Sequence, residues 1–326
     1  MRNRATTAAV SLPTRRRCNM GMGLHEWPLV FFTVLAQSAV GAFWVFTLLL
    51  LTEKSERAAT RTHYVMTVLW GLMAIGFIFS TLHLGSPQRA FNALNRIGAS
   101  GLSNEIAAGS AFFALGAGYW ALATARLLPQ AWQKLPVVGF VVRLLANISA
   151  KLPSIWRPLA LIVVSIVGAA FIYAMSKLYM IPTVPTWNSV FTPLSFLLTA
   201  LLGGSTLALA LLNSVKVAER LNGLLLTIAW LAFIAAVIVT YQQYGYLAGI
   251  SSAIHQALDL VPSFVPVMLT RFVLIAIGLL LLTVGVKKAN TALPFIGLIL
   301  IIAAELLARI IFYGLHMTVG MAALGY

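Results

Sequence analysis

The sequence WPLVFFTVLAQSAVGAFWVFTLLLL, from Trp27 to Leu51, contains no charged residue. A helix needs about 20 mostly apolar residues to cross a hydrocarbon core about 30 Å thick, so this segment is long enough to span a membrane. The whole chain is 60% hydrophobic and 9% charged. Soluble domains carry about 25% charged residues, and this chain lacks the polar surface that water requires. We therefore expect a membrane protein.

Seven further segments have the same character. Five of them carry no charge, and the last two carry Arg271 and the pair Glu305 and Arg309. Their lengths suit helices, because a membrane-spanning β-strand needs only about 10 residues. The predicted fold is all-α, a polytopic membrane protein of about eight transmembrane helices. The seven segments are Tyr64–Leu82, Ile106–Ala125, Pro158–Ser176, Ser189–Leu212, Gly223–Tyr241, Pro266–Val286 and Ala292–Leu315.

The basic residues between these segments predict the orientation of the chain, because Lys and Arg accumulate in cytoplasmic loops. The first, third, fifth and seventh loops are the more basic ones, so we expect both termini on the periplasmic side. The net charge of +15 is explained by these loops and does not indicate nucleic-acid binding. The loop residues are Lys54, Arg57, Arg61, Arg126, Lys134, Arg143, Lys151, Arg157, Lys216, Arg220, Lys287 and Lys288.

Residues 1–22 form a basic N-terminal tail that contradicts this orientation, since it holds five arginines. Either the tail overrides the charge bias of the loops, or the start is mis-assigned and translation begins at Met20 or Met22. We favour the second interpretation. Residues 23–326 are then a single membrane domain of eight helices.

The loop from Pro129 to Arg157 is the longest. Its apolar centre, Val137–Ala150, is too short to span a membrane and contains Arg143. One interpretation is an amphipathic helix lying on the cytoplasmic membrane surface. The other is an ordinary connecting loop.

Three chemically active side chains, His83, Arg89 and Glu105, lie between the second and third predicted helices. His83 closes one helix, Gly85–Pro87 break it, and Glu105 opens the next, so a short connection brings the three groups together at the external surface. An ionisable group at the edge of a membrane segment is a candidate functional residue.

This set suits the oxidation of a quinol, which enters from the lipid and must release protons as electrons leave. A histidine titrating near neutral pH can accept the hydroxyl proton, a carboxylate can relay it to water, and an arginine can keep that carboxylate ionised. The set also has an ordinary interpretation. Glu105 then favours a helix start, Arg89 anchors the chain at the interface and His83 caps a helix.

A second group of polar residues lies on the last segment. Glu305 and Arg309 are four residues apart, which favours an ion pair on one helix face, and His316 follows near the same face. One interpretation is functional, a proton path or a contact with the quinol head group. The other is a buried ion pair that holds this helix against the bundle, and we favour it. Arg271 either extends to the interface or joins this group, and His63 is expected at the interface.

Bound metal is not expected in this chain. Its single cysteine, Cys18, cannot hold an iron–sulfur cluster. A haem held by two histidines needs them on facing helices at similar depth. His83 and His316 are candidates for such a pair because both are near the outer end, but no segment has a histidine in its middle. We therefore expect no haem, no iron–sulfur cluster and no metal site.

Four stretches carry a resemblance to a known family. The chain resembles the membrane anchor subunit of bacterial dimethyl sulfoxide reductases, the DmsC-like family, over roughly residues 23–321. The stretches are His25-Glu-Trp-Pro-Leu29; Leu82-His-Leu-Gly-Ser-Pro87 with Arg89-Ala-Phe-Asn92 and Ser103-Asn-Glu105; Thr183-Val-Pro-Thr-Trp187; and Phe312-Tyr-Gly-Leu-His-Met-Thr-Val-Gly-Met321.

The resemblance implies an eight-helix subunit of the bacterial inner membrane, with periplasmic termini, that takes part in anaerobic respiration. Such a subunit binds and oxidises menaquinol, carries no haem, and passes electrons to an iron–sulfur subunit that feeds a molybdopterin catalytic subunit. The resemblance places His83 at the quinol, with Arg89 and Glu105 beside it, and Glu305 and Arg309 also match the family pattern.

Two other functions remain as alternatives. A transporter usually shows repeated halves and a polar site at mid-membrane, and we find no persuasive internal repeat in the sequence. A structural tether has no quinol site, and the set formed by His83, Arg89 and Glu105 argues against it.

Overall fold

The computed structural model describes residues 21–82, 87–128, 134–217, 219–251 and 256–319. Eight helices in these ranges are long and apolar enough to cross a membrane, and the described ranges contain no β-strand beyond an isolated bridge, Ser251 to Gln256. The all-α prediction is confirmed. The helices are α2 (Trp27–Thr52), α3 (Glu56–Leu82), α4 (Gly101–Thr124), α7 (Trp156–Tyr179), α8 (Phe191–Ser214), α9 (Asn222–Ala248), α10 (Phe264–Lys287) and α11 (Ala292–Gly314).

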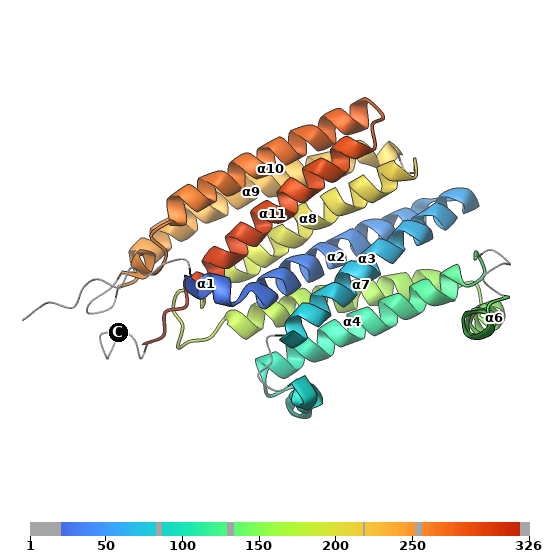
Figure 1. Ribbon diagram of the computed structural model, residues 1–326, viewed down its shortest axis with the longest axis horizontal. Helices are drawn as coiled ribbons and strands as arrows, with labels where there is room; N and C mark the ends of the chain where they lie inside the picture. The colour runs from blue at the N-terminus through green and yellow to red at the C-terminus, as the bar shows by residue number, and fades with distance from the viewer. Residues whose placement is uncertain (1–20, 83–86, 129–133, 218, 252–255, 320–326) are drawn as a thin grey trace, which may run out of the picture.

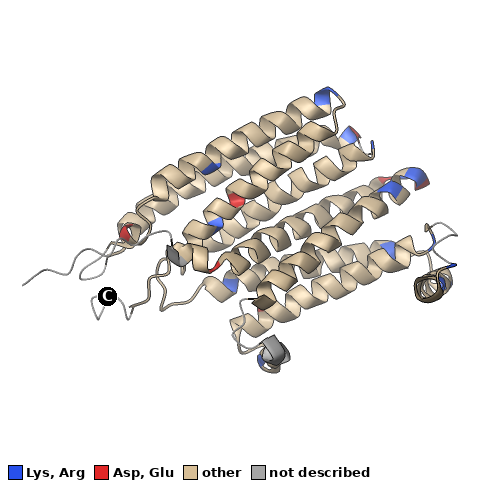
Figure 2. Ribbon diagram, viewed as in Figure 1, with Lys and Arg blue, Asp and Glu red and all other residues tan. Residues whose placement is uncertain are grey.

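The eight helices run side by side along the long axis of the molecule (Figure 1). We call the end at which α2 begins and α11 finishes the terminal end, and the opposite end the basic end. Lys and Arg gather at the basic end (Figure 2). Short elements cover the two ends: α1 (Gly21–His25), η1 (Pro87–Arg96) and η3 (Ala257–Leu260) at the terminal end, and α6 (Pro136–Lys151) and η2 (Glu219–Leu221) at the basic end.

The bundle consists of two halves of four helices, α2–α3–α4–α7 and α8–α9–α10–α11 (Figure 1). In each half the first helix packs against the second, and the third packs against the fourth. The halves join through α2 and α8, and each of these also touches the last helix of the other half. The order of helix contacts in the first half is thus repeated in the second, a regularity that we did not find in the sequence.

Glycines allow α2 and α8 to meet at the centre. A Cβ atom on Gly41 would collide with the backbone carbonyl of Ala200, and one on Gly204 would collide with the backbone of Gly41. Between membrane helices there is little hydrophobic driving force, so close backbone packing of small residues stabilises the pair. These two helices are also the most buried of the eight.

Several helices extend past the apolar segments that predicted them. α3 begins at Glu56 rather than Tyr64, which places His63 inside it. His63, which was expected at the interface, is buried within the bundle, and its Nε2 lies 3.0 Å from the hydroxyl of Tyr119 on α4. The long third loop contains a helix, α6, over Pro136–Lys151, so it is not an ordinary connecting loop there.

Candidate functional site

The structure does not describe the side chains of two members of the first predicted site. His83 lies outside the described residues, and of Arg89 the structure describes only the backbone, within η1. η1 leads into α4, which carries the third member, Glu105, at the terminal end.

Glu105 is buried rather than placed at the helix start. The capping position belongs to Ser100, whose hydroxyl accepts a hydrogen bond from the backbone N–H of Ser103 at 3.5 Å. Glu105 follows in the next turn, is 5% exposed, and its Oε1 has no hydrogen-bond partner among the described residues. A buried, unsatisfied carboxylate oxygen costs free energy, and such groups mark functional positions in membrane proteins.

Two buried tyrosines meet at the terminal end of the bundle. The hydroxyls of Tyr179, at the end of α7, and Tyr313, near the end of α11, are 2.7 Å apart. The tyrosine pair therefore joins the last helix of the first half to the last helix of the second half.

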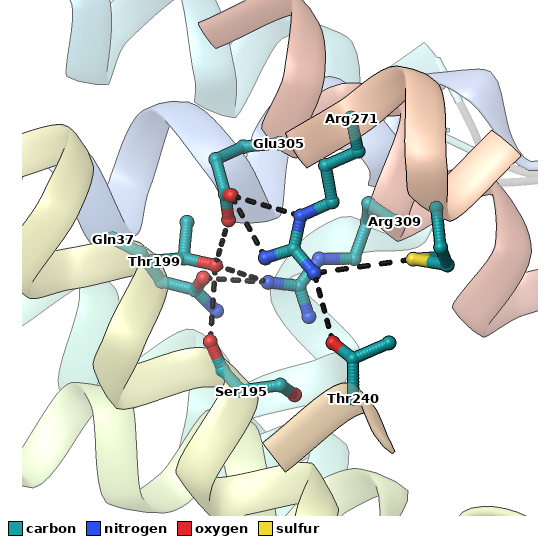
Figure 3. Close-up of polar contacts among 8 residues, drawn as sticks. Gln37, Ser195, Thr199, Thr240, Arg271, Glu305 and Arg309 are labelled. Carbon is teal, nitrogen blue, oxygen red and sulfur yellow. Dashed lines mark hydrogen bonds and ion pairs between the residues drawn. The ribbon is translucent and has the colours of Figure 1, made fainter. Parts of the chain in front are cut away.

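The predicted ion pair between Glu305 and Arg309 is wrong. Oε1 of Glu305 instead accepts hydrogen bonds from Arg271 on α10, at 2.9 Å from Nη2 and 3.2 Å from Nε (Figure 3). Its Oε2 accepts a hydrogen bond from the hydroxyl of Thr199 at 2.6 Å. Arg271 thus joins the cluster rather than extending to the interface.

Arg309 binds partners on α2 and α8, and the hydroxyl of Thr199 bridges it to Glu305. Its Nη2 donates to Oε1 of Gln37 at 2.7 Å and to the hydroxyl of Thr199 at 3.4 Å, and its guanidinium lies 3.9 Å from the centre of the Phe196 ring. The hydrogen bond to the amide of Gln37 and the cation–π contact with Phe196 stabilise the guanidinium of Arg309. These contacts with neighbouring helices replace an ion pair with Glu305 on its own helix.

The cluster links five helices at one depth, because Nη1 of Arg271 also donates to the hydroxyl of Thr240 on α9 at 3.4 Å. Gln37, Thr199, Thr240, Arg271 and Glu305 lie about 10–15 Å along their helices from the terminal end at 1.5 Å per residue. Beside them is a pocket of about 40 Å³, whose polar lining consists of Ser195, Thr199, Thr240, Gln243, Arg271 and Arg309. This space suits a few water molecules, because one water needs about 10–15 Å³ in such a measure.

His316 lies just beyond α11 and apart from the cluster. Its ring is 4.7 Å from that of Trp187, whose Nε1 donates to the carbonyl of Phe312 at 2.7 Å. Burial lowers the pKa of His316, and the carboxylate of Glu26 partly opposes this shift. The imidazole is therefore held uncharged near neutral pH.

Sequence reasoning missed Gln37, Thr199, Tyr179 and Tyr313. Gln37 was detectable as the one amide in the first apolar segment. Tyr313 lies in the stretch from Phe312 to Met321 that carries the family resemblance, but no role was assigned to it. Thr199 and Tyr179 gave no signal, because only packing assigns their partners. Among the described residues no group of three or more His, Cys, Asp or Glu is arranged to hold a metal ion.

Comparison with known proteins agrees with the resemblance seen in the sequence. The chain matches the family described as DMSO reductase anchor subunit (DmsC) over residues 20–145 and 136–315. It is 44% identical to the C subunit of the anaerobic dimethyl sulfoxide reductase of Haemophilus influenzae over 303 residues, which cover 93% of this chain and 99% of that protein.

Two Escherichia coli proteins are similar to the same degree. The anaerobic dimethyl sulfoxide reductase subunit YnfH is 43% identical, and the match covers 94% of this chain and 100% of that protein. The C subunit of the anaerobic dimethyl sulfoxide reductase is also 43% identical, and the match covers 93% of this chain and 99% of that protein. With this similarity along nearly its whole length, the chain belongs to the family of dimethyl sulfoxide reductase anchor subunits.

Proposed function

We propose that this multi-pass anchor subunit binds menaquinol at its terminal end, oxidises it and passes the electrons to an iron–sulfur subunit, which feeds a molybdopterin catalytic subunit. The observation that carries the proposal is Glu105, a buried carboxylate whose Oε1 has no hydrogen-bond partner among the described residues. It lies on the helix that follows η1, at the end of the bundle where a lipid-soluble quinol can approach.

Quinol oxidation releases two electrons and two protons, and this chain handles the protons. His83 accepts a proton from a quinol hydroxyl, Glu105 passes protons to the water at the terminal end, and Arg89 keeps Glu105 ionised between turnovers. The electrons leave to the iron–sulfur subunit. We place the terminal end on the periplasmic side of the bacterial inner membrane, because the basic end carries the excess of Lys and Arg.

The cluster of Arg271, Glu305 and Arg309 serves as a structural lock in this proposal. Each charged group already has partners within the bundle, and the adjoining pocket of about 40 Å³ is too small for a quinol ring. His316 lies at the same end and is the one residue of the last predicted group that remains as a quinol contact.

The test uses the complete reductase in membranes. His83→Ala and Glu105→Gln should each abolish quinol-dependent reduction of the terminal acceptor, while reduction driven by an artificial electron donor continues. Glu219→Gln, an exposed change at the basic end, is the matched control and should leave both activities intact. Unchanged quinol oxidation in both site variants would show that the chain is only a tether.

The transporter alternative does not agree with the family. The structural repeat removes one argument against a transporter, so the decision rests on the family match and the position of the polar groups. These groups lie in the terminal half of the bundle, whereas transporter sites lie near mid-membrane.

A further inference from the structure

The helix α6 has no counterpart in the second half of the bundle. In the first half, α6 stands between the third and fourth helices, α4 and α7. In the second half, α10 ends at Lys287 and α11 begins at Ala292, and a short turn joins them. A four-helix half therefore forms without such a helix, and α6 needs another explanation.

One face of α6 packs on the bundle. Gly139, Val142 and Ser149 are its buried residues, and the helix contacts α4 at the basic end. Figure 1 shows α6 nearly end-on while the eight spanning helices run lengthwise. The long axis of the bundle is the expected membrane normal, so α6 lies roughly parallel to the membrane surface.

The face of α6 turned away from the bundle is apolar. Val137, Phe140, Val141, Leu144 and Ile148 follow one another at the three- and four-residue spacing of a single helical face. All five are exposed, with Val137 at 76% and Phe140 at 62%. A stripe of this kind on a helix at the membrane surface costs free energy in water and is stabilised in the headgroup–acyl boundary of a bilayer.

The segment around α6 has charge of one sign only. Between Glu105 and Glu219 the sequence contains no Asp or Glu. Five cations surround or lie on α6, namely Arg126, Lys134, Arg143, Lys151 and Arg157. Lys and Arg close to an anionic lipid surface are attracted to it, so this segment matches such a surface in charge as well as in apolar character.

We propose that α6 is an in-plane membrane helix that inserts its apolar stripe into the same bilayer the bundle spans and binds anionic phospholipid head groups through its cations. The partner is the lipid surface at the basic end. The helix couples the first half of the bundle, which carries Glu105, to the composition of that surface through its contact with α4.

The position of α6 is tested in the complete subunit by spin labelling. In a Cys18→Ser background, a nitroxide on Ile148→Cys, in the apolar stripe, should collide more with oxygen than with a water-soluble nickel chelate in vesicles containing phosphatidylglycerol. A label on the exposed Ala150→Cys, about 160° around the helix from Ile148, is the matched control and should show the reverse order. An Ile148 label as accessible to the nickel chelate as the Ala150 label would overturn the proposal.

The lipid preference needs a second measurement. Phosphatidylglycerol added to the detergent-purified complex should raise its thermal unfolding midpoint more than phosphatidylcholine does. Lys134→Gln with Lys151→Gln should remove most of that difference, whereas Lys287→Gln with Lys288→Gln, at the same end of the bundle, should retain it. Equal responses to the two lipids in the parent, or equal losses in the two double variants, would refute binding by α6.

Discussion

At the scale of single residues, Glu105 is set apart by its buried Oε1, which has no hydrogen-bond partner among the described residues. Position alone left open whether this glutamate favours a helix start, and Ser100 occupies the capping position instead. A buried carboxylate oxygen without a partner is unusual in a folded protein, because no hydrogen bond offsets the cost of removing it from water. The pair formed by Tyr179 and Tyr313, at the same end of the bundle, shows how packing brings together residues from distant parts of the chain.

His316 should make the stability of the protein depend on pH. Burial lowers the pKa of this imidazole below that of an exposed histidine. The unfolded chain therefore binds more protons than the folded protein in acid, so the stabilisation is complete above the ordinary histidine pKa and is lost as the pH falls through it. We expect His316→Gln to reduce the pH dependence of the thermal unfolding midpoint over this range.

The measurement compares the midpoints of parent and variant above and below the ordinary histidine pKa. The variant should show the smaller decrease on acidification. An identical decrease in both proteins would exclude a contribution from His316.

At the scale of elements, buried polar contacts specify which helices adjoin. Arg271 of α10 pairs with Glu305 of α11, and Arg309 of α11 contacts Gln37 of α2. Spacing within one helix predicted a pair between Glu305 and Arg309, and it failed because neighbouring helices offered each group a better partner. In a bilayer an unpaired charge is costly, so these contacts restrict how the helices assemble.

Breaking the pair between Arg271 and Glu305 should be strongly destabilising. Arg271→Met leaves a buried carboxylate without its partner, and the expected loss is about 3–5 kcal/mol. Arg271→Met combined with Glu305→Leu should recover most of this loss, because the double variant removes both charged groups and leaves neither of them unpaired. The readout is the thermal unfolding midpoint of the purified subunit and its yield in membranes.

The matched control is the exposed pair at the basic end. Nη2 of Arg220 lies 3.4 Å from a carboxylate oxygen of Glu53, and the arginine side chain is 53% exposed. Arg220→Gln should cost no more than about 1 kcal/mol. A double variant no more stable than Arg271→Met alone would contradict the role of the pair as a lock.

At the scale of the whole molecule, two similar four-helix halves carry different polar groups. The first half carries the predicted quinol site and α6, and the second half supplies Arg271, Glu305 and Arg309. Both groups lie toward the terminal end, and the excess of cations lies at the basic end (Figure 2). This asymmetry along the membrane normal suits an enzyme complex that takes its substrate from lipid and delivers electrons on one side.

Turnover should be electroneutral if the quinol site and the docked reductase share the terminal side. Protons and electrons then leave the quinol on the same side, so no charge crosses the membrane. Proteoliposomes containing the complete complex and a voltage-sensitive dye should show no potential during quinol oxidation. An imposed potassium diffusion potential is the positive control, and a potential that builds up with turnover would contradict the common side.

The sequence by itself determined the number of membrane helices, their order and the family, because a segment of about 20 apolar residues has few alternatives to a spanning helix. It also marked Glu105, Arg271, Glu305 and Arg309, since charges are rare in such segments. Only the tertiary structure decided the partners of these charges, the meeting of α2 and α8 at glycines and the repeat of the two halves. The physical reason is that hydrophobicity depends on local composition, whereas partners and packing depend on contacts between segments far apart in the chain.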